Sequence, residues 1–266
     1  MINSLARTLC AALLVSAVPG AAFAEASTRM AGPAAADNVS YRVQPRLPST
    51  LEIPSSGRFV LVDAASAQLF MIEDGRVQDT MRVIVGKPDA ATPVVKSAIY
   101  DATLNPYWHV PADLARTIIA PRVLKDGASY LKERGYQVLS SFDEDAREIP
   151  VSSVDWKAVA EGKARVFVRQ LPGPTNSMGR MKFAFANEGG IYLHDTPRKE
   201  LFDDPERKLS AGCVRLEDAE RLASWLLGTD PEASNSTPEQ KVALPRPVPI
   251  TITYLDQPAR IQLAGL

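Results

Sequence analysis

A run of short strands joined by a two-residue turn constrains the fold of this chain more than any other stretch. Three segments rich in β-branched and aromatic residues are predicted as strands, over residues 58–63, 67–72 and 76–85. In the third strand, apolar residues alternate from Met81 to Val85, as expected where one face is buried. Asp74-Gly75 between the last two strands is a strong hairpin signal. We therefore expect the folded part to begin at Gly57 as a β-rich unit.

The next two hundred residues read as more strands interrupted by a helical segment. Further strands are predicted near 97–104, over 182–187, at 191–194 ending on His194, and at 248–255, with prolines making 105–111 an irregular loop. Residues 112–170 instead show helical spacing at Leu114, Ile118 and, past a break at Pro121, Leu124. Within them, SSVDWKAVAEG predicts a serine cap followed by a short helix. This segment is predicted to be an insertion into a β-rich α+β domain.

An amphipathic helix is predicted at 217–228, after the chain's second cysteine. Its apolar face consists of Ala219, Leu222, Ala223 and Leu226. Glu217 and Asp218 suit the first turn and Gly228 the end of the helix. The final residues, 259–266, are predicted to be a tail.

The amino terminus predicts export. Residues 1–24 carry a single cation, Arg7, then an apolar run and a small-x-small site at Ala22-Phe23-Ala24, which together indicate a cleaved signal peptide. The apolar run is too short and alanine-rich for a good membrane-spanning helix. Residues 25–56, rich in alanine, proline and serine, are predicted as a flexible leader. The mature protein is therefore expected to be periplasmic.

Charge excludes several classes of partner. With Arg7 removed, the 30 basic residues become 29 against 31 acidic ones, so the mature chain is nearly neutral. No basic face indicates nucleic acid, and no polybasic run indicates anionic lipid. Composition indicates a soluble, globular, extracytoplasmic protein.

Signal cleavage would also leave Cys213 as the lone cysteine, which cannot form an internal disulfide. It is either a small buried hydrophobe or a reactive thiol. Its neighbours favour the second interpretation, because His194 can act as a base, and Arg215 and the following helix N-terminus can favour a thiolate. The backbone N–H groups at Gly212 and Cys213 could receive an oxyanion. These ingredients belong to acyl transfer.

Other chemistries find less support. An imidazole base needs an orienting group, and Asp195, Ser210 and a backbone carbonyl all remain candidates. One mature cysteine and two histidines without close spacing do not make a zinc site, so no metal or cofactor is expected. No G-x-S-x-G elbow supports a serine hydrolase. His109 is assigned to packing or the surface, and Trp108 to the core or the wall of a cleft.

The segment HDTPRKELFDDPERKLSAGCVRLED resembles the signature of the L,D-transpeptidase catalytic domain of the YkuD type. That signature is a histidine, about fifteen residues, then Ser/Thr-His-Gly-Cys followed closely by arginine. Here it corresponds to His194, a fifteen-residue spacer, and Ser210 to Arg215. The resemblance spans residues 57–255 and includes VGKPDAATPV, NPYWHVP, GPTNSMGRMKF and YLHDTP. The inserted segment is similar to that of the longer periplasmic branch of Gram-negative bacteria.

The resemblance implies a β-sandwich with a helix after the catalytic cysteine and a partly helical lid at 112–170, within a catalytic domain at 57–258. It also implies a reaction on peptidoglycan stem peptides that forms 3→3 cross-links and is sensitive to carbapenems. The implied roles are Cys213 as nucleophile, His194 as base and then acid, Gly212 with Asp195 and Ser210 as oxyanion or orienting groups, and Arg215, Tyr192, Trp108 and Asn105 as substrate-binding residues. The acyl acceptor stays open between a stem amine, water and an amine of an outer-membrane protein or lipoprotein, so L,D-carboxypeptidase or endopeptidase activity and protein anchoring remain alternatives with the same acyl chemistry.

Three other classes of protein compete with this interpretation. Papain-like wall hydrolases place the cysteine before the histidine, and sortases carry a different cysteine strand with a distant arginine. A decayed peptidoglycan-binding protein would fit Ala211, which stands where many family members have histidine or serine. Retention of Cys213, His194 and Arg215 together argues against decay. The oligomeric state is not indicated.

Overall fold

The computed structural model describes residues 51–231 and 237–266. The predicted signal peptide, 1–24, and most of the predicted leader, 25–56, lie outside these residues. None of the helices within the two described ranges has the length and apolarity that a membrane span requires.

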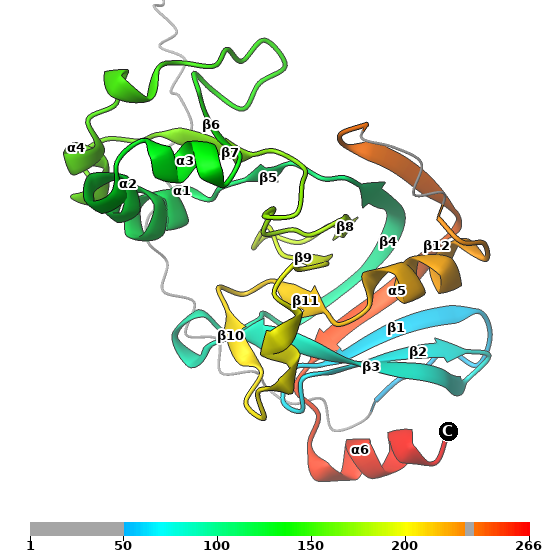
Figure 1. Cartoon of the computed structure of the whole chain (residues 1–266). Coiled ribbons are helices and arrows are strands. Elements are labelled where there is room, and N and C mark those ends of the chain that lie inside the picture. The colour runs from blue at the N-terminus through cyan, green and yellow to red at the C-terminus, as the bar shows by residue number, and fades with distance from the viewer. Residues whose placement is uncertain (1–50, 232–236) are drawn as a thin grey trace, which may run out of the picture. The chain divides into compact units, whose positions relative to one another are not determined.

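The strands of the described residues form one large sheet that closes on itself. Its strands are β1 (Arg58–Asp63), β2 (Gln68–Glu73), β3 (Arg76–Gly86), β4 (Val95–Leu104), β8 (Met181–Phe185), β9 (Tyr192–His194), β10 (Lys208–Ser210), β11 (Val214–Leu216) and β12 (Gln240–Thr253). Their order is β10-β3-β11-β9-β8-β4-β12-β1-β2, and β2 also pairs with β3, which closes the ring (Figure 1). The predicted β-rich α+β class is confirmed.

The β2–β3 hairpin forms at the predicted turn. Glu73 pairs with Arg76, so Asp74 and Gly75 are the two loop residues. Their φ angles are 52° and 73°, and positive φ at both positions is the mark of a type I′ turn. This turn matches the twist of the strands, which is why the Asp-Gly pair was so informative.

Alternate residues of the closed sheet point into a common apolar core. Phe183, Leu193 and Val214 from neighbouring strands are fully buried there. The predicted amphipathic helix, α5 (Ala219–Leu227), packs its apolar face into the same core. Gly228 ends it in the left-handed conformation, as predicted, but the helix begins at Ala219, so Asp218 is its N-cap and Glu217 precedes it rather than lying in the first turn.

A second helix, α6 (Gln257–Ala264), covers the outer face of β1 and β2. Its buried Ala259 and Leu263 pack with a cluster that includes Leu61. The prediction of a tail at 259–266 is therefore wrong, because two buried apolar residues one turn apart hold these residues on the sheet. The predicted end of the flexible leader at residue 56 is also wrong, because Leu51 is buried in this cluster.

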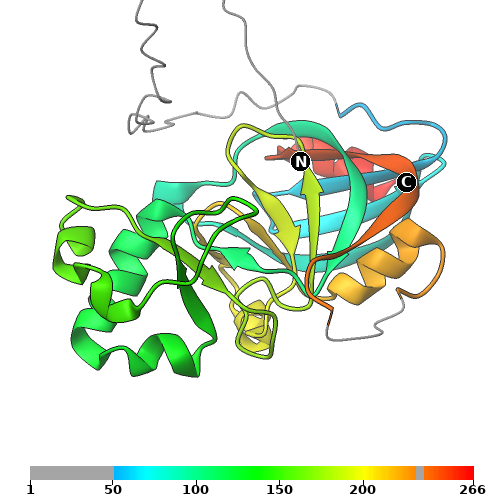
Figure 2. The same ribbon diagram turned by 90° about the horizontal axis from the view of Figure 1, so that it is seen from above.

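Residues 108–170 form a group of elements with a core of their own, and this group is called the insertion below. It comprises β5 (Trp108–His109), α1 (Ala112–Leu114), the π-helical turn η2 (Ala115–Ile119), α2 (Ala120–Asp126), α3 (Ser129–Glu133), β6 (Tyr136–Leu139), the 3₁₀ turn η3 (Val151–Ser153), α4 (Trp156–Ala160) and β7 (Phe167–Gln170). The strands pair in the order β5-β7-β6, and the helices gather beside them (Figure 2). Two further 3₁₀ turns, η1 (Pro88–Ala90) and η4 (Lys199–Asp203), lie outside the insertion.

The apolar face predicted for the first helix of the insertion is wrong beyond Leu114, which does pack against the core of the insertion. Ile118 and Leu124 are exposed, whereas Ala115, Ile119 and Val123 are buried. The cause is the π-helical turn η2, whose wider turn shifts the phase of a 3.6-residue pattern.

Two other element predictions need correction. The cap of α4 is Asp155, whose carboxylate accepts from the N–H of Ala158, and not a serine. β12 begins at Gln240 rather than at 248, because an irregular register between Ala243 and Val248 accommodates the intervening prolines.

Candidate active site

Two short parallel strands bring the predicted site residues together. β9 and β11 are neighbours, and Arg215 pairs with His194 as Val214 pairs with Leu193. Leu193 and Val214 point into the core, so His194 and Arg215 share the opposite, outer face of the sheet. Cys213 immediately precedes β11, and its sulfur accepts a hydrogen bond from the backbone N–H of Tyr192.

The loop before Cys213 is shaped by two small residues. The Ser210 hydroxyl donates to the carbonyl of Cys213 at 2.5 Å and accepts from the N–H of Gly212 at 3.1 Å. Gly212 has a φ of 118°, and a Cβ there would lie 3.2 Å from Cδ1 of Ile191, so a glycine is required. Because the Gly212 N–H is occupied, Cys213 N–H is the remaining candidate of the two predicted oxyanion donors.

A buried threonine, Thr92, which the sequence analysis missed, holds this loop in place through hydrogen bonds. Thr92 Oγ1 accepts from the N–H of Gly86 and donates to the carbonyl of Gly212, both at 2.8 Å. Tyr254 in turn donates its hydroxyl proton to the Thr92 carbonyl at 2.7 Å. No local pattern links residues 120 positions apart, so only the VGKPDAATPV resemblance could have indicated Thr92.

The imidazole of His194 is oriented by a backbone carbonyl. Its Nδ1 lies 2.5 Å from the carbonyl oxygen of Asp195. A carbonyl only accepts, so Nδ1 carries the proton and Nε2 keeps its lone pair. This resolves the three alternatives left open by the sequence.

The two side chains predicted as orienting groups make other contacts. The Asp195 carboxylate accepts from the N–H of Arg180 at 2.9 Å and from Lys199 Nζ at 2.6 Å. The close approach of Asp195 requires Gly179, where a Cβ would lie 2.3 Å from Oδ2 of Asp195. Ser210 is occupied by the loop. Neither side chain holds the imidazole.

Burial sets the protonation states of the site. It lowers the pKa of His194 to about 4, assisted by the cation of Arg215 and opposed by the Asp195 carbonyl. Burial also raises the pKa of the Cys213 thiol, although the Tyr192 N–H and Arg215 act in the opposite direction. Near pH 7 both groups are therefore neutral, and the imidazole keeps the lone pair on Nε2.

This corrects the expectation that a helix N-terminus favours the thiolate. Strand β11 separates Cys213 from α5, which begins only at Ala219. Asp218 moreover caps that helix with its own carboxylate. The dipole effect falls off within one turn, so α5 contributes little at the sulfur.

Arg215 carries a charge that no side chain of the described ranges balances, since none of the ion pairs there includes it. Its guanidinium is partly buried, and its pKa is lowered by burial and then by the nearby cation of Arg198. Arg198 itself pairs with Glu200 at 3.2 Å, so Arg215 is the cation of the two that keeps an unbalanced charge, which favours an anionic ligand.

Trp108 and Asn105, the remaining residues predicted to bind substrate, lie outside strands β9 and β11. Trp108 packs in the core of the insertion, its ring 6.3 Å from that of Tyr136. Asn105 directly follows β4, and its carbonyl accepts from the N–H of Glu239 at 3.0 Å. A substrate-binding role for either stays a prediction. Ala211 is exposed, so the departure at this position leaves the hydrogen bonds around Cys213 intact.

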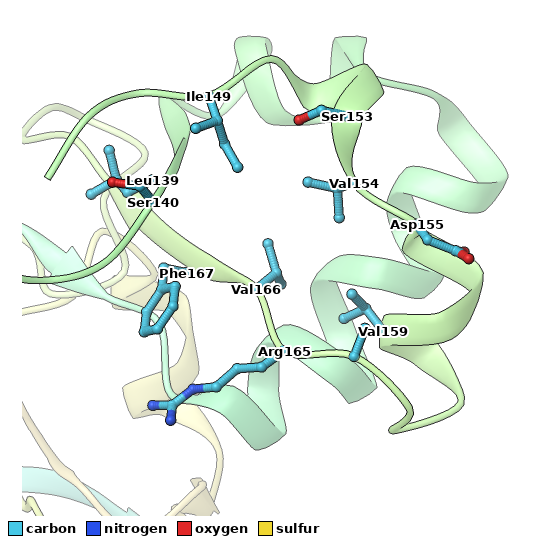
Figure 3. A pocket seen from close by; sticks show the side chains of 11 residues that line it. Leu139, Ser140, Ile149, Ser153, Val154, Asp155, Val159, Arg165, Val166 and Phe167 are labelled. Atoms are coloured by element: carbon cyan, nitrogen blue, oxygen red, sulfur yellow. The ribbon is translucent and has the colours of Figure 1, made fainter. Parts of the chain in front are cut away.

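A cavity of about 260 Å³ lies within the insertion and is separate from this site (Figure 3). It is lined mainly by apolar side chains from β6, α4 and the start of β7, among them Leu139, Val159 and Phe167. None of the predicted site residues borders it. The described ranges contain no group of three or more histidine, cysteine, aspartate or glutamate residues placed to hold a metal ion.

Comparison with known proteins gives one clear family. Residues 57–250 match the model of the YkuD family, described as the L,D-transpeptidase catalytic domain. A Haemophilus influenzae protein provisionally named an L,D-transpeptidase is 35% identical over 175 residues, which are 66% of this chain and 35% of that protein. The chain thus spans about a third of the length of this relative.

Solved structures were found with low similarity. An L,D-transpeptidase from Mycobacterium smegmatis is 14% identical, with a TM-score of 0.36, over 74% of this chain and 59% of that one. The catalytic domain of the E. faecium L,D-transpeptidase is 12% identical, with a TM-score of 0.33, over 74% of this chain and 97% of that one. The family model covers most of the chain and contains both His194 and Cys213, so the chain belongs to the YkuD family of L,D-transpeptidase catalytic domains.

Proposed function

We propose that this protein is a periplasmic peptidoglycan L,D-transpeptidase that forms 3→3 cross-links through a cysteine acyl-enzyme. The observation that carries the proposal is the position of the free Cys213 thiol directly before β11, next to the strand β9 that ends on His194, whose buried imidazole has Nδ1 fixed by the Asp195 carbonyl. Family membership supports the same activity. This arrangement suits acyl transfer because it supplies a nucleophile and an oriented base without a cofactor.

In the first step, Cys213 Sγ attacks the carbonyl of the third residue of a tetrapeptide stem, at that residue's L-centre. His194 Nε2 takes the thiol proton as the C–S bond forms. The neutral states of both groups suit this concerted transfer, since no thiolate has to exist beforehand. The tetrahedral oxyanion would be received by the N–H of Cys213. Collapse breaks the amide bond, and His194 returns the proton to the departing amine of D-alanine.

The second step transfers the acyl group. The side-chain amine of a second stem, that of diaminopimelate, attacks the thioester carbon, and His194 accepts a proton from this amine. The C–S bond breaks, the thiolate recovers its proton from His194, and a 3→3 amide is released. Water as the acceptor gives a tripeptide instead, and an amine of an outer-membrane protein or lipoprotein gives a protein anchored to the wall.

The surrounding residues would bind the donor stem. The unbalanced cation of Arg215, with Arg198 nearby, suits the terminal carboxylate of that stem. Tyr192, half-buried beside Cys213, would form one wall, with Trp108 and Asn105 toward the insertion. The insertion would act as a lid that keeps water from the thioester. Carbapenems are expected to acylate Cys213 by the same attack.

The test is to incubate residues 25–266 with a disaccharide-tetrapeptide and to follow products by chromatography and intact mass. Wild type should give a dimer that lacks one D-alanine, and Cys213→Ala should give none. Production of tripeptide alone would overturn cross-linking as the main reaction and leave acyl transfer to water or to an untested amine. Wild type that matches the Cys213→Ala background would overturn the enzymatic function altogether.

A further inference from the structure

A charged pair lies on the same face of the sheet as His194. Lys182 of β8 is the register partner of His194, so the two side chains leave neighbouring strands toward the same side. The Lys182 ammonium lies 3.0 and 3.1 Å from the two carboxylate oxygens of Glu239. In the strand order β9-β8-β4-β12, Glu239 stands just before β12, so Lys182 leans across β4 and away from His194.

Glu239 is held in place by two backbone groups. Its φ of 54° is in the left-handed region, which a non-glycine residue seldom adopts, and its N–H donates to the Asn105 carbonyl at 3.0 Å. Its Oε1 accepts from the N–H of Tyr107 at 2.6 Å. The carboxylate is therefore fixed between the sheet and the start of the insertion.

Lys182 Nζ and Glu239 Oε2 can each form further hydrogen bonds. Within the described ranges Lys182 Nζ, which has three donors, bonds only to Glu239, and Glu239 Oε2 accepts only from Lys182. The side chains are 15% and 28% exposed, so the pair is largely sheltered but open on one side.

Further charged and polar side chains lie near the Lys182–Glu239 pair. The fields of Lys182 and Glu239 both act on the pKa of His109, whose strand partner is Arg169. Burial, then Cys213 and then the charge of Glu239 raise the pKa of Tyr192, the residue whose N–H bonds to Cys213. Tyr192 thus lies near both Cys213 and the pair.

We propose that Lys182 and Glu239 recognise the distal end of the donor stem's third residue when that end is itself an amino-acid centre, as in diaminopimelate. Lys182 would bind its carboxylate and Glu239 its ammonium. This inference rests on the proposed function, because the acyl carbonyl must lie at Cys213. The geometry suits a donor side chain. In diaminopimelate the distal centre is four bonds from the L-centre, and the Lys182–Glu239 pair is displaced from His194 by about the length of an extended lysine side chain.

A simpler alternative is that the pair only ties the insertion to the sheet. Partly exposed ion pairs contribute little to stability. A tie would affect every substrate alike, whereas a recognition site would discriminate between donors that differ only at the distal centre.

The experiment is single-turnover acylation of Cys213, followed by intact mass, with three tetrapeptide donors. They carry diaminopimelate, diaminopimelate amidated at its distal carboxylate, or L-lysine as third residue. Wild type should prefer the first by about tenfold, as expected for one charge-assisted hydrogen-bonded contact. Lys182→Met should lose this preference, and Lys182→Arg should keep most of it. Lys163→Met, which breaks an exposed lysine–glutamate pair of the insertion, is the matched control and should match wild type.

Glu239→Gln provides a second arm. It should lose discrimination against a donor whose distal amine is acetylated, while the preference for the free carboxylate survives. If Lys182→Met slows all donors equally and keeps the wild-type ratio, the recognition role is overturned in favour of a tie. If wild type is acylated by none of the donors, the proposed function fails, which is a distinguishable result.

Discussion

At the scale of the residue, His194 is unusual because its burial keeps the imidazole neutral well below its ordinary pKa. The folded pKa is about 4, so the base form persists through the mildly acidic range. We expect the second-order rate of acyl-enzyme formation to fall only as pH approaches 4. Arg215→Met should move this acid limb to higher pH, because the Arg215 cation helps to depress the pKa. A limb near pH 6.5 in wild type would contradict this description of the base.

The same shift predicts an acid-sensitive stability. As pH falls below about 6.5, the histidine of the unfolded chain gains a proton that the folded chain refuses until pH 4. The free energy of unfolding should therefore decrease across this window, by about 3 kcal/mol from this group, and then level off. Urea titrations of wild type and His194→Gln at several pH values measure the difference. Parallel pH dependences would rule out a buried neutral His194.

Thr92 is the residue through which a distant loop holds Gly212. Thr92→Val keeps the shape but leaves the Gly86 N–H and the Gly212 carbonyl without their partner. We expect a loss of about 1–3 kcal/mol in unfolding free energy together with slower acylation of Cys213. Thr92→Ser keeps the hydroxyl and should retain most of both. Equal behaviour of the two variants in urea denaturation and acylation would show that the bridge does not position the loop.

At the scale of the element, the sequence predicts best where a local rule decides the structure. The Asp74-Gly75 turn and the caps of α5 follow from the backbone preferences of a few adjacent residues. Prediction failed where tertiary contacts or an irregular helical turn decide which residues are buried. The π-helical turn before α2 is an example, because it shifts the apolar pattern. The contacts of Lys182 with Glu239 and of Thr92 with Gly212 join distant strands, and no local pattern contains them.

The clearest missed element, α6, allows a direct test. Leu263 is buried against the outer face of β1 and β2, whereas Ile261 on the same helix is 67% exposed. We expect Leu263→Ala to lower the free energy of unfolding by about 2–3 kcal/mol, because it leaves a cavity at this interface. Ile261→Ala should stay within about 0.5 kcal/mol of wild type. Thermal or urea unfolding distinguishes them, and equal losses would show that α6 does not pack as described.

At the scale of the whole molecule, the buried apolar residues fall into separate clusters. The sheet and α5 surround one core, and the insertion surrounds another with no residue in common. Contacts such as Tyr107 with Glu239 connect the two regions through polar groups rather than through shared packing. Because cooperativity comes mainly from shared burial, the insertion should be able to open without the sheet.

Native-state hydrogen exchange tests this independence. Ile119→Ala creates a cavity in the core of the insertion, so we expect faster exchange at amides of 108–170 and unchanged protection in β8, β9 and β11. Ile118→Ala is the matched control, because its side chain is largely exposed and its loss removes little packing. Accelerated exchange in β9 as great as that in the insertion would mean that the two cores unfold as one unit. Independent opening would instead give the proposed lid its physical basis, since a segment with its own core can move as a body while His194 and Cys213 stay fixed.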